Sequence, residues 1–463
     1  MRGRTVLILL VLVVGLVAFI ELYEHKLPSS EERAVLEKLV FEANEDEILA
    51  LELNWSEGFV RLERSAGGEW RLVEPISARA DGDLVASVVE SLVTLEKKRT
   101  LEGTSHEETG LDPPRLTAAL ITANGRSELL VGSEVPAGNS MIASRTADGE
   151  IFVVDDAVWP ELRRQPGEWR SRQVLGVGEE RVQSLAIETS AQRLALSRKG
   201  SDFWLEAPAV DRADPEKVGD LLTALASMRV VSFVDDLPGS LGDLGLDPPV
   251  ASLEITTGDS AEPQHLAWGG PVAGEETLHY ARVEDQVVAT EGDLMQYLDV
   301  PAAEWQSLEL TSLETFQIDT MQVLQKDLDA LTLMRQGANW KSGEDEISFT
   351  SVSDLLYAIA GARAESVLPV QKADFLGLES AGPSLELILQ GQQLEQSVSL
   401  YLSGEAGARA VVSERDVVLL VGHDEFTEIL AKVAAVRAAA SIKTAADEQL
   451  QNGTSELNSD QQR

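Results

Sequence analysis

Histidines are the first side chains to consider for catalysis or metal binding, and the chain of 463 residues has five. A metal site built on one helix needs two ligands three or four residues apart, and no two of these histidines are that close. None recurs at the repeat period described below. They are His25, His106, His265, His279 and His423. This pattern predicts no metal centre.

Carboxylate pairs are the next candidates, because two acids can hold calcium or act as general acid and base. Asp81 with Asp83, and Asp235 with Asp236, are such pairs, but neither lies in a loop with the alternating ligands of an EF-hand. The chain has 78 acidic residues, so a single pair carries little information. We expect a solvated acidic surface, and a hydrolase using two carboxylates remains an alternative.

Motifs for nucleophilic or nucleotide chemistry are missing from the sequence. It contains no G-x-S-x-G elbow, no P-loop and no dinucleotide fingerprint. It also has no cysteine, which excludes disulfides, thiolate ligands and cysteine nucleophiles. We therefore expect a protein that is not an enzyme, with no catalytic residue, no metal and no cofactor.

The charge of the chain bears on its partners. It has 38 Lys plus Arg against 78 Asp plus Glu, a formal charge of −40, and 44% hydrophobic residues. The hydrophobic fraction is that of a globular protein, so the acidity does not indicate disorder. A chain with this negative charge repels the phosphate backbones of nucleic acids, and we therefore expect no nucleic-acid partner.

An apolar segment near the N-terminus predicts the location of the protein. Residues 5–22 are almost unbroken in apolar character, follow Arg2 and Arg4, and reach the short end of what spans a bilayer. A signal peptidase site fits poorly there, so we expect an uncleaved transmembrane signal anchor, with a cleaved signal peptide as the alternative. The arginines orient the rest of the chain outside the cytoplasm. Residues 23–45 read as a polar spacer.

A repeat organises the remainder of the chain. Its landmarks recur after 133–136 residues: Trp70 and Trp204, Arg79–Asp81 and Arg212–Asp214, Gly110–Pro114 and Gly245–Pro249 (both GLDPP), and Trp169 and Trp305. A degenerate third copy contains Trp340 and Gly377 but lacks the terminal tryptophan. We place the three repeats at 46–176, 177–310 and 311–440, and expect a disordered tail over 441–463.

Each repeat reads as strands, one helix, and further hairpin strands. Asp81 and Asp214 are good N-caps for helices with apolar residues on one face, and Ser353 is the expected cap of the third helix. We therefore expect an α+β fold: three tandem strand-rich repeats, each an antiparallel sheet with one main helix, after a single N-terminal transmembrane helix.

The repeated residues have a structural interpretation and a functional one. Glycine at a turn followed by two prolines explains the GLDPP elements, which contain Gly110, Asp112, Pro113, Gly245, Asp247 and Pro248. The tryptophans Trp70, Trp204 and Trp340 are expected to anchor the cores. Arg99, Arg229 and Arg363 end the helices and complement the macrodipole, or form a partner site repeated on one face.

An N-terminal anchor, the W-x-L-x-x-P pattern at Trp70–Pro75, Ala80-Asp81 and a GLDPP-like element together resemble the domain-of-unknown-function family numbered 4340. The second copy carries the same elements, and the third carries them weakly. Members are usually described beside ABC-transporter components related to gliding-motility export. The resemblance implies an envelope protein accessory to a transporter and no catalytic residues.

Three functions follow from these observations. The leading hypothesis is a non-enzymatic scaffold, anchored in the inner (cytoplasmic) membrane with its bulk in the periplasm, that docks an ABC-transporter permease or another envelope protein. The second is a glycan- or cation-binding module, with Trp159, Trp169 and Trp305 as stacking candidates. The third is the hydrolase mentioned above.

Overall fold

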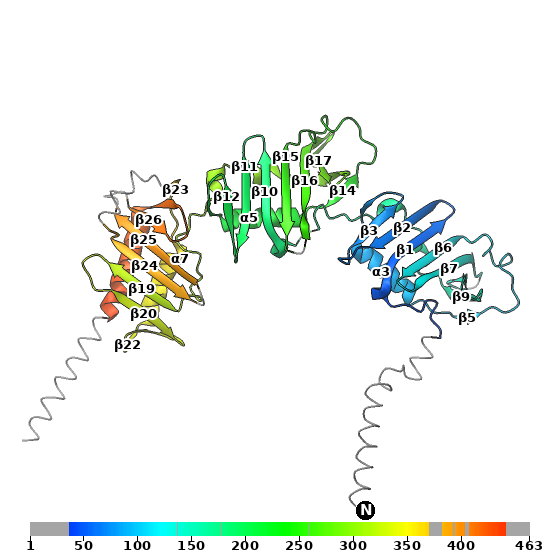
Figure 1. Ribbon diagram of the computed structural model, residues 1–463, viewed down its shortest axis with the longest axis horizontal. Coiled ribbons are helices and arrows are strands. Elements are labelled where there is room, and N and C mark those ends of the chain that lie inside the picture. Colours follow the sequence, from blue (N-terminus) through cyan, green and yellow to red (C-terminus); the bar gives the residue numbers. More distant parts are fainter. Residues whose placement is uncertain are drawn as a thin grey trace, which may run out of the picture. The chain divides into compact units, whose positions relative to one another are not determined.

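Three antiparallel sheets of nine strands each, with few helices, make up the described part of the chain (Figure 1). The computed structural model describes residues 37–136, 138–176, 178–258, 260–369, 382–391, 394–402 and 407–440. The predicted α+β class is therefore wrong, because the protein is mostly β. Helices are conspicuous in a sequence through their apolar period, whereas edge strands of two residues, such as Ala78–Arg79, have no period to detect.

The predicted transmembrane helix over residues 5–22 lies outside the described residues, as do most of the spacer and the tail over 441–463. Among the residues that are described, no helix has both the length and the apolar character required to cross a membrane.

The first sheet has the strand order β4-β3-β2-β1-β6-β7-β8-β9-β5. Its central strand β1 buries Leu51 and Leu53 against helix α3 (Gly82–Val93), whose Val85 and Leu92 complete the same core. The strands are β1 Ile48–Trp55, β2 Gly58–Arg64, β3 Trp70–Glu74, β4 Ala78–Arg79, β5 Arg99–Thr100, β6 Leu116–Thr122, β7 Gly125–Glu134, β8 Ser140–Arg145 and β9 Ile151–Asp155.

The second sheet has the equivalent order β13-β12-β11-β10-β15-β16-β17-β18-β14, with helix α5 (Pro215–Ser227) on its core face. Its strands are β10 Val182–Thr189, β11 Arg193–Lys199, β12 Asp202–Ala207, β13 Asp211–Arg212, β14 Val230–Phe233, β15 Ala251–Thr257, β16 Ser260–Val272, β17 Glu275–Val283 and β18 Gln286–Glu291. The equivalent order shows that the sheets repeat.

The third sheet follows the same plan, β22-β21-β20-β19-β24-β25-β26-β27-β23, with helix α7 (Phe349–Gly361). Its strands are β19 Thr320–Gln325, β20 Leu331–Gln336, β21 Asn339–Ser342, β22 Asp345–Ile347, β23 Ser366–Pro369, β24 Leu385–Gly391, β25 Leu394–Leu402, β26 Ala408–Val412 and β27 Val417–Val421. In the text below, repeats 1, 2 and 3 denote the three sheets with their helices.

The N-caps predicted for the first two helices are confirmed. The Asp81 side chain accepts a hydrogen bond from the Leu84 N–H, and the Asp214 side chain accepts from Glu216 and Lys217. The prediction for the third helix is wrong, because α7 begins at Phe349 after Ser348, and Ser353 lies inside it. A serine that fits a cap pattern also fits within a helix whose apolar period starts earlier.

The structure at the end of each repeat explains why the third copy has no terminal tryptophan. Short 3-10 helices, Pro166–Trp169 and Ala302–Trp305, bury Trp169 and Trp305 in the cores of repeats 1 and 2. The small helices Trp159–Leu162 (α4) and Met295–Leu298 (α6) precede them, while Glu45–Glu47 and Glu179–Arg181 form single 3-10 turns before β1 and β10. In repeat 3, a helix over 423–440 takes this place and buries Phe426, Ile429, Val433 and Val436.

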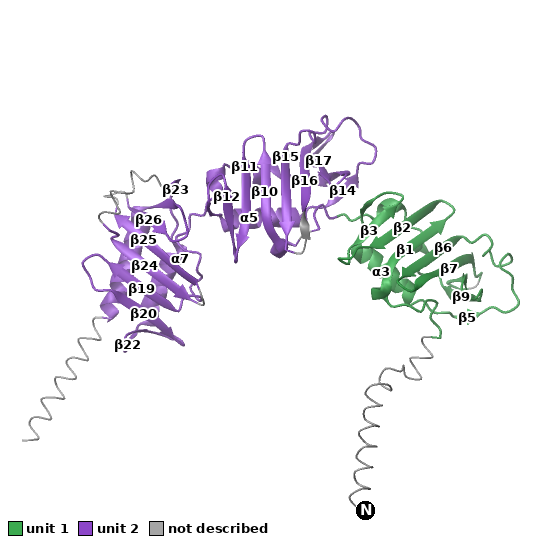
Figure 2. Cartoon of the chain, viewed as in Figure 1, with its two compact units in different colours: residues 1–172 green, residues 173–463 purple. Residues whose placement is uncertain are grey.

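The chain divides into two compact units, Met1–Arg172 and Gln173–Arg463 (Figure 2). Repeat 1 belongs to the first unit. Repeats 2 and 3 both belong to the second unit, so the contacts between them are contacts within one unit.

Candidate functional site

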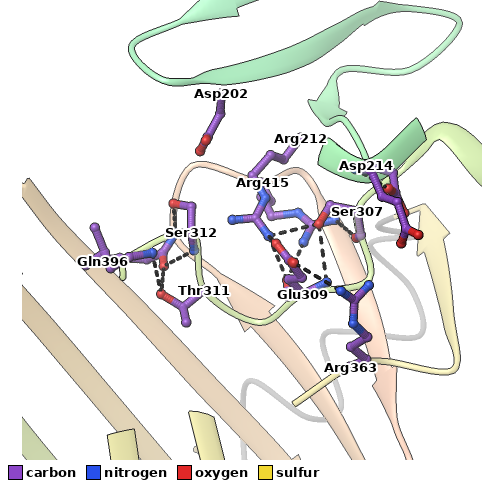
Figure 3. A network of polar contacts seen from close by, with 12 residues as sticks. Asp202, Arg212, Asp214, Ser307, Glu309, Thr311, Ser312, Arg363, Gln396 and Arg415 are labelled. Atoms are coloured by element: carbon purple, nitrogen blue, oxygen red, sulfur yellow. Dashed lines mark hydrogen bonds and ion pairs between the residues drawn. The ribbon is translucent and has the colours of Figure 1, made fainter. Parts of the chain in front are cut away.

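The candidate site lies within the second unit, where repeat 2 meets repeat 3 (Figure 3). Arg415, in the turn between β26 and β27, reaches Asp211 of β13, which precedes it by 204 residues. Arg415 Nε and Nη2 donate to the two Asp211 carboxylate oxygens at 2.7 and 2.9 Å. The side chains are 2% and 0% exposed. This fork-to-fork geometry is the strongest form of an arginine–carboxylate pair.

The remaining polar atoms of this pair are also occupied. Arg415 Nη2 donates to the Ser307 carbonyl at 2.7 Å and Nη1 to the Glu309 carbonyl at 3.0 Å. Asp211 accepts further bonds from the Arg212 N–H and from the Gln306 side chain. A buried charge is tolerated when it is paired and hydrogen-bonded, and here every nitrogen of the Arg415 guanidinium and both oxygens of the Asp211 carboxylate take part in hydrogen bonds.

A second ion pair lies beside the first. Arg212 Nη2 donates to the Glu309 carboxylate and to the Ser307 hydroxyl, both at 2.9 Å. Burial lowers the pKa of the Arg212 guanidinium from its ordinary value, the Glu309 carboxylate acts in the opposite direction, and Arg415 lowers it further. Arg363, two residues after α7, approaches the other Glu309 oxygen at 3.5 Å.

The chain segment that joins the two repeats is held along its length. The Ser307 N–H donates to the Arg212 carbonyl at 2.9 Å, and the Ala364 N–H donates to the Leu308 carbonyl at 2.7 Å. Further along, the Gln396 side-chain oxygen accepts from the Thr311 hydroxyl at 2.6 Å and from the Ser312 N–H at 3.2 Å. Repeat 2 therefore contacts this segment on one side and repeat 3 on the other.

A cavity of about 780 Å³ opens next to these ion pairs. One wall is apolar and consists of Val218, Gly219, Leu222 and Ala226 of α5, which share one helix face. The other lining residues are mostly polar: Gly178, Glu179, Glu180, Arg198, Ser201, Asp202, Phe203, Arg212, Ala213, Pro215, Glu309, Thr311, Ser312, Leu313, Glu314 and Ala360. A cavity of this size and mixed lining is typical of a ligand site at the junction of two modules.

The core tryptophans predicted from the sequence include one error. Trp70 and Trp340 are buried, and Trp70 lies opposite Arg64 on β2 just as Trp340 lies opposite Arg335 on β20. In repeat 2 the residue opposite the equivalent Arg198 is Phe203, not Trp204. Successive strand residues point to opposite faces, so Trp204 lies on the other side of the sheet, where Lys199 stacks on its ring.

The arginine on each core aromatic ring is a feature that sequence reasoning missed. The guanidinium carbon lies 5.9 Å from the Trp70 ring centre, 4.5 Å from Phe203 and 5.1 Å from Trp340. The arginines are Arg64, Arg198 and Arg335. In each repeat the arginine lies near the end of the strand that precedes the aromatic strand. Aligning these preceding strands would have revealed the repeated arginine, since the arginine and the ring are cross-strand partners.

The GLDPP elements have the turn geometry that favours glycine. Gly110 has φ +70° and Gly245 has φ +68°, and a Cβ on Gly245 would lie 2.9 Å from the Gly270 amide nitrogen. The Asp112–Pro113 and Asp247–Pro248 bonds are cis. Gly377, the counterpart proposed for repeat 3, lies outside the described residues.

The three arginines proposed as partner contacts are not equivalent in the structure. Arg229 and Arg363 form isolated bridges with Gln173 and Glu309, and the residue in that position of repeat 1 is Glu96, which bridges Leu39. Arg229 Nη1 donates to the Ala226 carbonyl at the end of α5, as expected for a cation that complements a helix C-terminus. Arg99 lies exposed on β5, six residues after α3 ends. They do not form one repeated surface.

Two of the three tryptophans proposed for glycan stacking are enclosed. Trp169 and Trp305 are 0% and 1% exposed, whereas Trp159 is half-buried beside Arg163. Across the described ranges, no three His, Asp or Glu side chains gather into a group suited to a metal ion. Asp211 and Arg415, which the sequence did not single out, are the most deeply buried ion pair among the described residues.

Comparisons with known proteins add the following. The family model "Domain of unknown function (DUF4340)" matches residues 70–237 and 204–381. No curated protein matches the chain. Solved structures with weak similarity include the DNA polymerase III subunit beta from Pseudomonas aeruginosa (9% identity, TM-score 0.16, covering 84% of this chain and 95% of that one) and from Borrelia burgdorferi (8%, TM-score 0.15, 85% and 95%). Similarity at this level carries no argument about fold or function.

Proposed function

The chain belongs to the DUF4340 family, and from this premise we propose that it is a non-enzymatic accessory or scaffold protein of an ABC-transporter-type envelope complex. In this proposal the apolar N-terminal segment attaches the protein to the cytoplasmic membrane, and the repeats lie outside the cytoplasm. Its partner is a transporter permease or another envelope protein, and the repeats supply the contact surfaces.

One observation carries the proposal, namely the buried ion pairs that join repeat 3 to repeat 2. The Asp211–Arg415 pair is enclosed and bidentate, and Arg212 with Glu309 forms a second pair beside it. Breaking a buried pair leaves an uncompensated charge, so the junction resists bending more than a flexible linker would. A scaffold that must present two surfaces at once needs this property.

The repeated sheets give additional support. Tandem copies of one topology provide several similar surfaces, which is how repeat proteins bind extended partners. The outer faces differ in chemistry, since repeat 1 pairs Glu52 with Arg61 and Arg126 across its strands. The equivalent of Glu52 in repeat 2 is Ala186, which occupies the same place in the β10–β15 pairing. Different copies can therefore bind different parts of a partner.

Co-purification tests the proposal. We expect the full-length protein to remain with the membrane fraction after a carbonate wash and, in mild detergent, to elute together with a transporter permease. A variant lacking residues 5–22 should leave the membrane fraction. Recovery of the full-length protein alone, after chemical crosslinking in intact cells, would contradict the scaffold role.

A further inference from the structure

The cavity between repeats 2 and 3 has an uncompensated negative charge, even though two arginines line it. Arg198 donates to the Val182 and Glu179 carbonyls at 2.8 and 3.1 Å, and it also stacks on Phe203. Arg212 is committed to Glu309 and Ser307. Both guanidinium groups are held by the protein, although Arg212 Nε has no hydrogen-bond partner among the described residues. The lining contains five carboxylates against these two cations, so its net charge is negative.

Three carboxylates of the lining form no ion pair within 4 Å in the described part of the chain, although one of them, Asp202, interacts with the charge of Arg212 at longer range. They are Glu179, Asp202 and Glu314. Asp202 is the most enclosed of the three, and its side chain extends toward the segment that contains Ser312 (Figure 3). Glu179 and Glu314 are exposed, and Asp202 is half-buried. Because opposite charges attract, these acids favour a ligand that supplies positive charge.

The wall of the cavity formed by α5 favours a ligand that also carries apolar groups. Val218 and Leu222 present aliphatic carbon to the cavity along the face of α5, and Ala226 extends this face by one turn. From Val218 to Ala226 the helix rises about 12 Å. An extended peptide of about four residues covers the same length.

Gly219 is an independent sign that the space is needed. It lies within α5, where glycine is destabilising relative to alanine. A Cβ at this position would meet nothing within 4 Å, so packing does not require glycine. The corresponding residues of the other helices, counted from the N-cap, are Ala86 and Ser353. What the glycine does here is widen the cavity.

We infer that this cavity binds a short, extended peptide segment with alternating basic and apolar side chains. The basic side chains bind Asp202 and Glu314, and the apolar ones lie on Val218 and Leu222. The inference rests on the proposed function in so far as the segment belongs to an envelope partner. The binding event itself depends only on the cavity.

The test uses the purified full-length protein in mild detergent and a fluorescein-labelled peptide of alternating Lys and Leu, six residues long, with fluorescence anisotropy as the readout. We expect saturable binding that weakens with added salt. A peptide with Glu in place of Lys should not bind. Absence of binding up to about 1 mM, or equal binding of the Glu peptide, would overturn the inference.

Two variants, each with a control variant on α5, locate the site. Gly219→Trp fills the cavity and should abolish binding, while Thr223→Trp, on an exposed position of the same helix, should not. Asp202→Asn should weaken binding about tenfold, which corresponds to about 1.4 kcal/mol. Asp220→Asn is the matched charge control. Unchanged binding by Gly219→Trp would place the peptide elsewhere and overturn the inference.

Competition with spermidine separates a peptide from a simple polycation. We expect the unlabelled peptide to displace the probe at much lower concentration than spermidine, because spermidine cannot use the apolar wall. Equal displacement would overturn the peptide assignment. If binding succeeds but the co-purification fails, the proposed transporter partner is wrong and the site stands; the reverse outcome removes the site alone.

Discussion

Arg415 and Asp211 are the residues on which the junction between repeats 2 and 3 depends most. Their mutual attraction offsets the cost of burying two charges, and four hydrogen bonds engage all three nitrogen atoms of the Arg415 guanidinium. A pair of this kind does not necessarily add stability compared with an apolar pair. Removal of one partner alone, however, leaves a buried charge without compensation.

We predict that Arg415→Met lowers the free energy of unfolding of the second unit by about 3–5 kcal/mol. The double variant Asp211→Leu, Arg415→Met should recover most of this loss, because no charge is then left unpaired. Urea unfolding of both variants and the parent protein measures the difference. A loss for the single variant below about 1 kcal/mol, the size typical of an exposed pair, would contradict this account.

Glu150 is the residue from which a pH dependence can be argued. Its carboxylate accepts from Lys97 Nζ at 2.9 Å and from the Thr100 hydroxyl at 2.8 Å. These contacts, Lys97 first, lower the pKa of Glu150 from its ordinary value. A lowered pKa stabilises the folded state above the unfolded-state pKa, about 4.3 for Glu, and this contribution disappears as the pH falls through the folded-state value.

We therefore predict that Glu150→Gln lowers the melting temperature of repeat 1 at pH 6–8 and that the deficit shrinks below about pH 4. Thermal unfolding of parent and variant across pH 3–8 provides the measurement. Lys97→Met should reproduce the same pH profile. A deficit that is independent of pH would show that the Lys97 contact is not its source.

At the scale of the elements, strand register decides which aromatic residue enters the core. In β12 the cross-strand partner of Arg198 is Phe203, and Trp204 is one residue further along. A shift of one residue transfers every side chain of a strand to the opposite face. The period of about 134 residues aligns Trp204 with Trp70, although the residue in the equivalent position of the second sheet is Phe203. Sequence spacing cannot detect this difference, because the loops before β12 can absorb one residue.

We predict that Phe203→Ala costs about 3–5 kcal/mol, as for a large aromatic residue in a core. Trp204→Ala should cost about 1 kcal/mol or less, because its side chain lies on the solvent-facing side of the sheet. Urea unfolding of the two variants gives the comparison. A larger loss for Trp204 would show that the register is shifted by one residue.

The helices α3 and α5 were predictable for a local reason. Their N-caps, Asp81 and Asp214, bond to N–H groups two or three residues away, so the signal lies within one turn. The short edge strands were not predictable, because two residues have no period and their pairing partner is distant in sequence. Arg99–Thr100, for example, pairs with β9 more than fifty residues later.

At the scale of the whole molecule, the segment that joins repeats 2 and 3 within the second unit is hydrogen-bonded to both repeats. The amide of Ser307 bonds to repeat 2, and the Leu308 carbonyl accepts from Ala364 of repeat 3. The carbonyls of Ser307 and Glu309 both accept from Arg415. The loss of one side chain should therefore loosen the segment without unfolding either sheet.

We predict that Arg415→Met accelerates amide hydrogen exchange over residues 306–314 by about tenfold or more, the rate change for an opening free energy lowered by about 1.4 kcal/mol. Exchange in the strands of repeat 1 should stay unchanged, since these strands belong to the other unit. Hydrogen exchange followed by mass spectrometry resolves both regions. Equal acceleration everywhere would indicate global destabilisation instead of a local opening.

The sequence by itself determined the repeat, the caps of two helices and the turns that need Gly110 and Gly245, because each depends on residues close together in the chain. The family followed from the same local motifs. Only the tertiary structure decided that the protein is mostly β, that Phe203 occupies the Trp70 position, and that Arg415 meets Asp211 across 204 residues. No sequence period relates Asp211 to Arg415, because they are too far apart in the chain. Only folding brings the two charges together at a buried position.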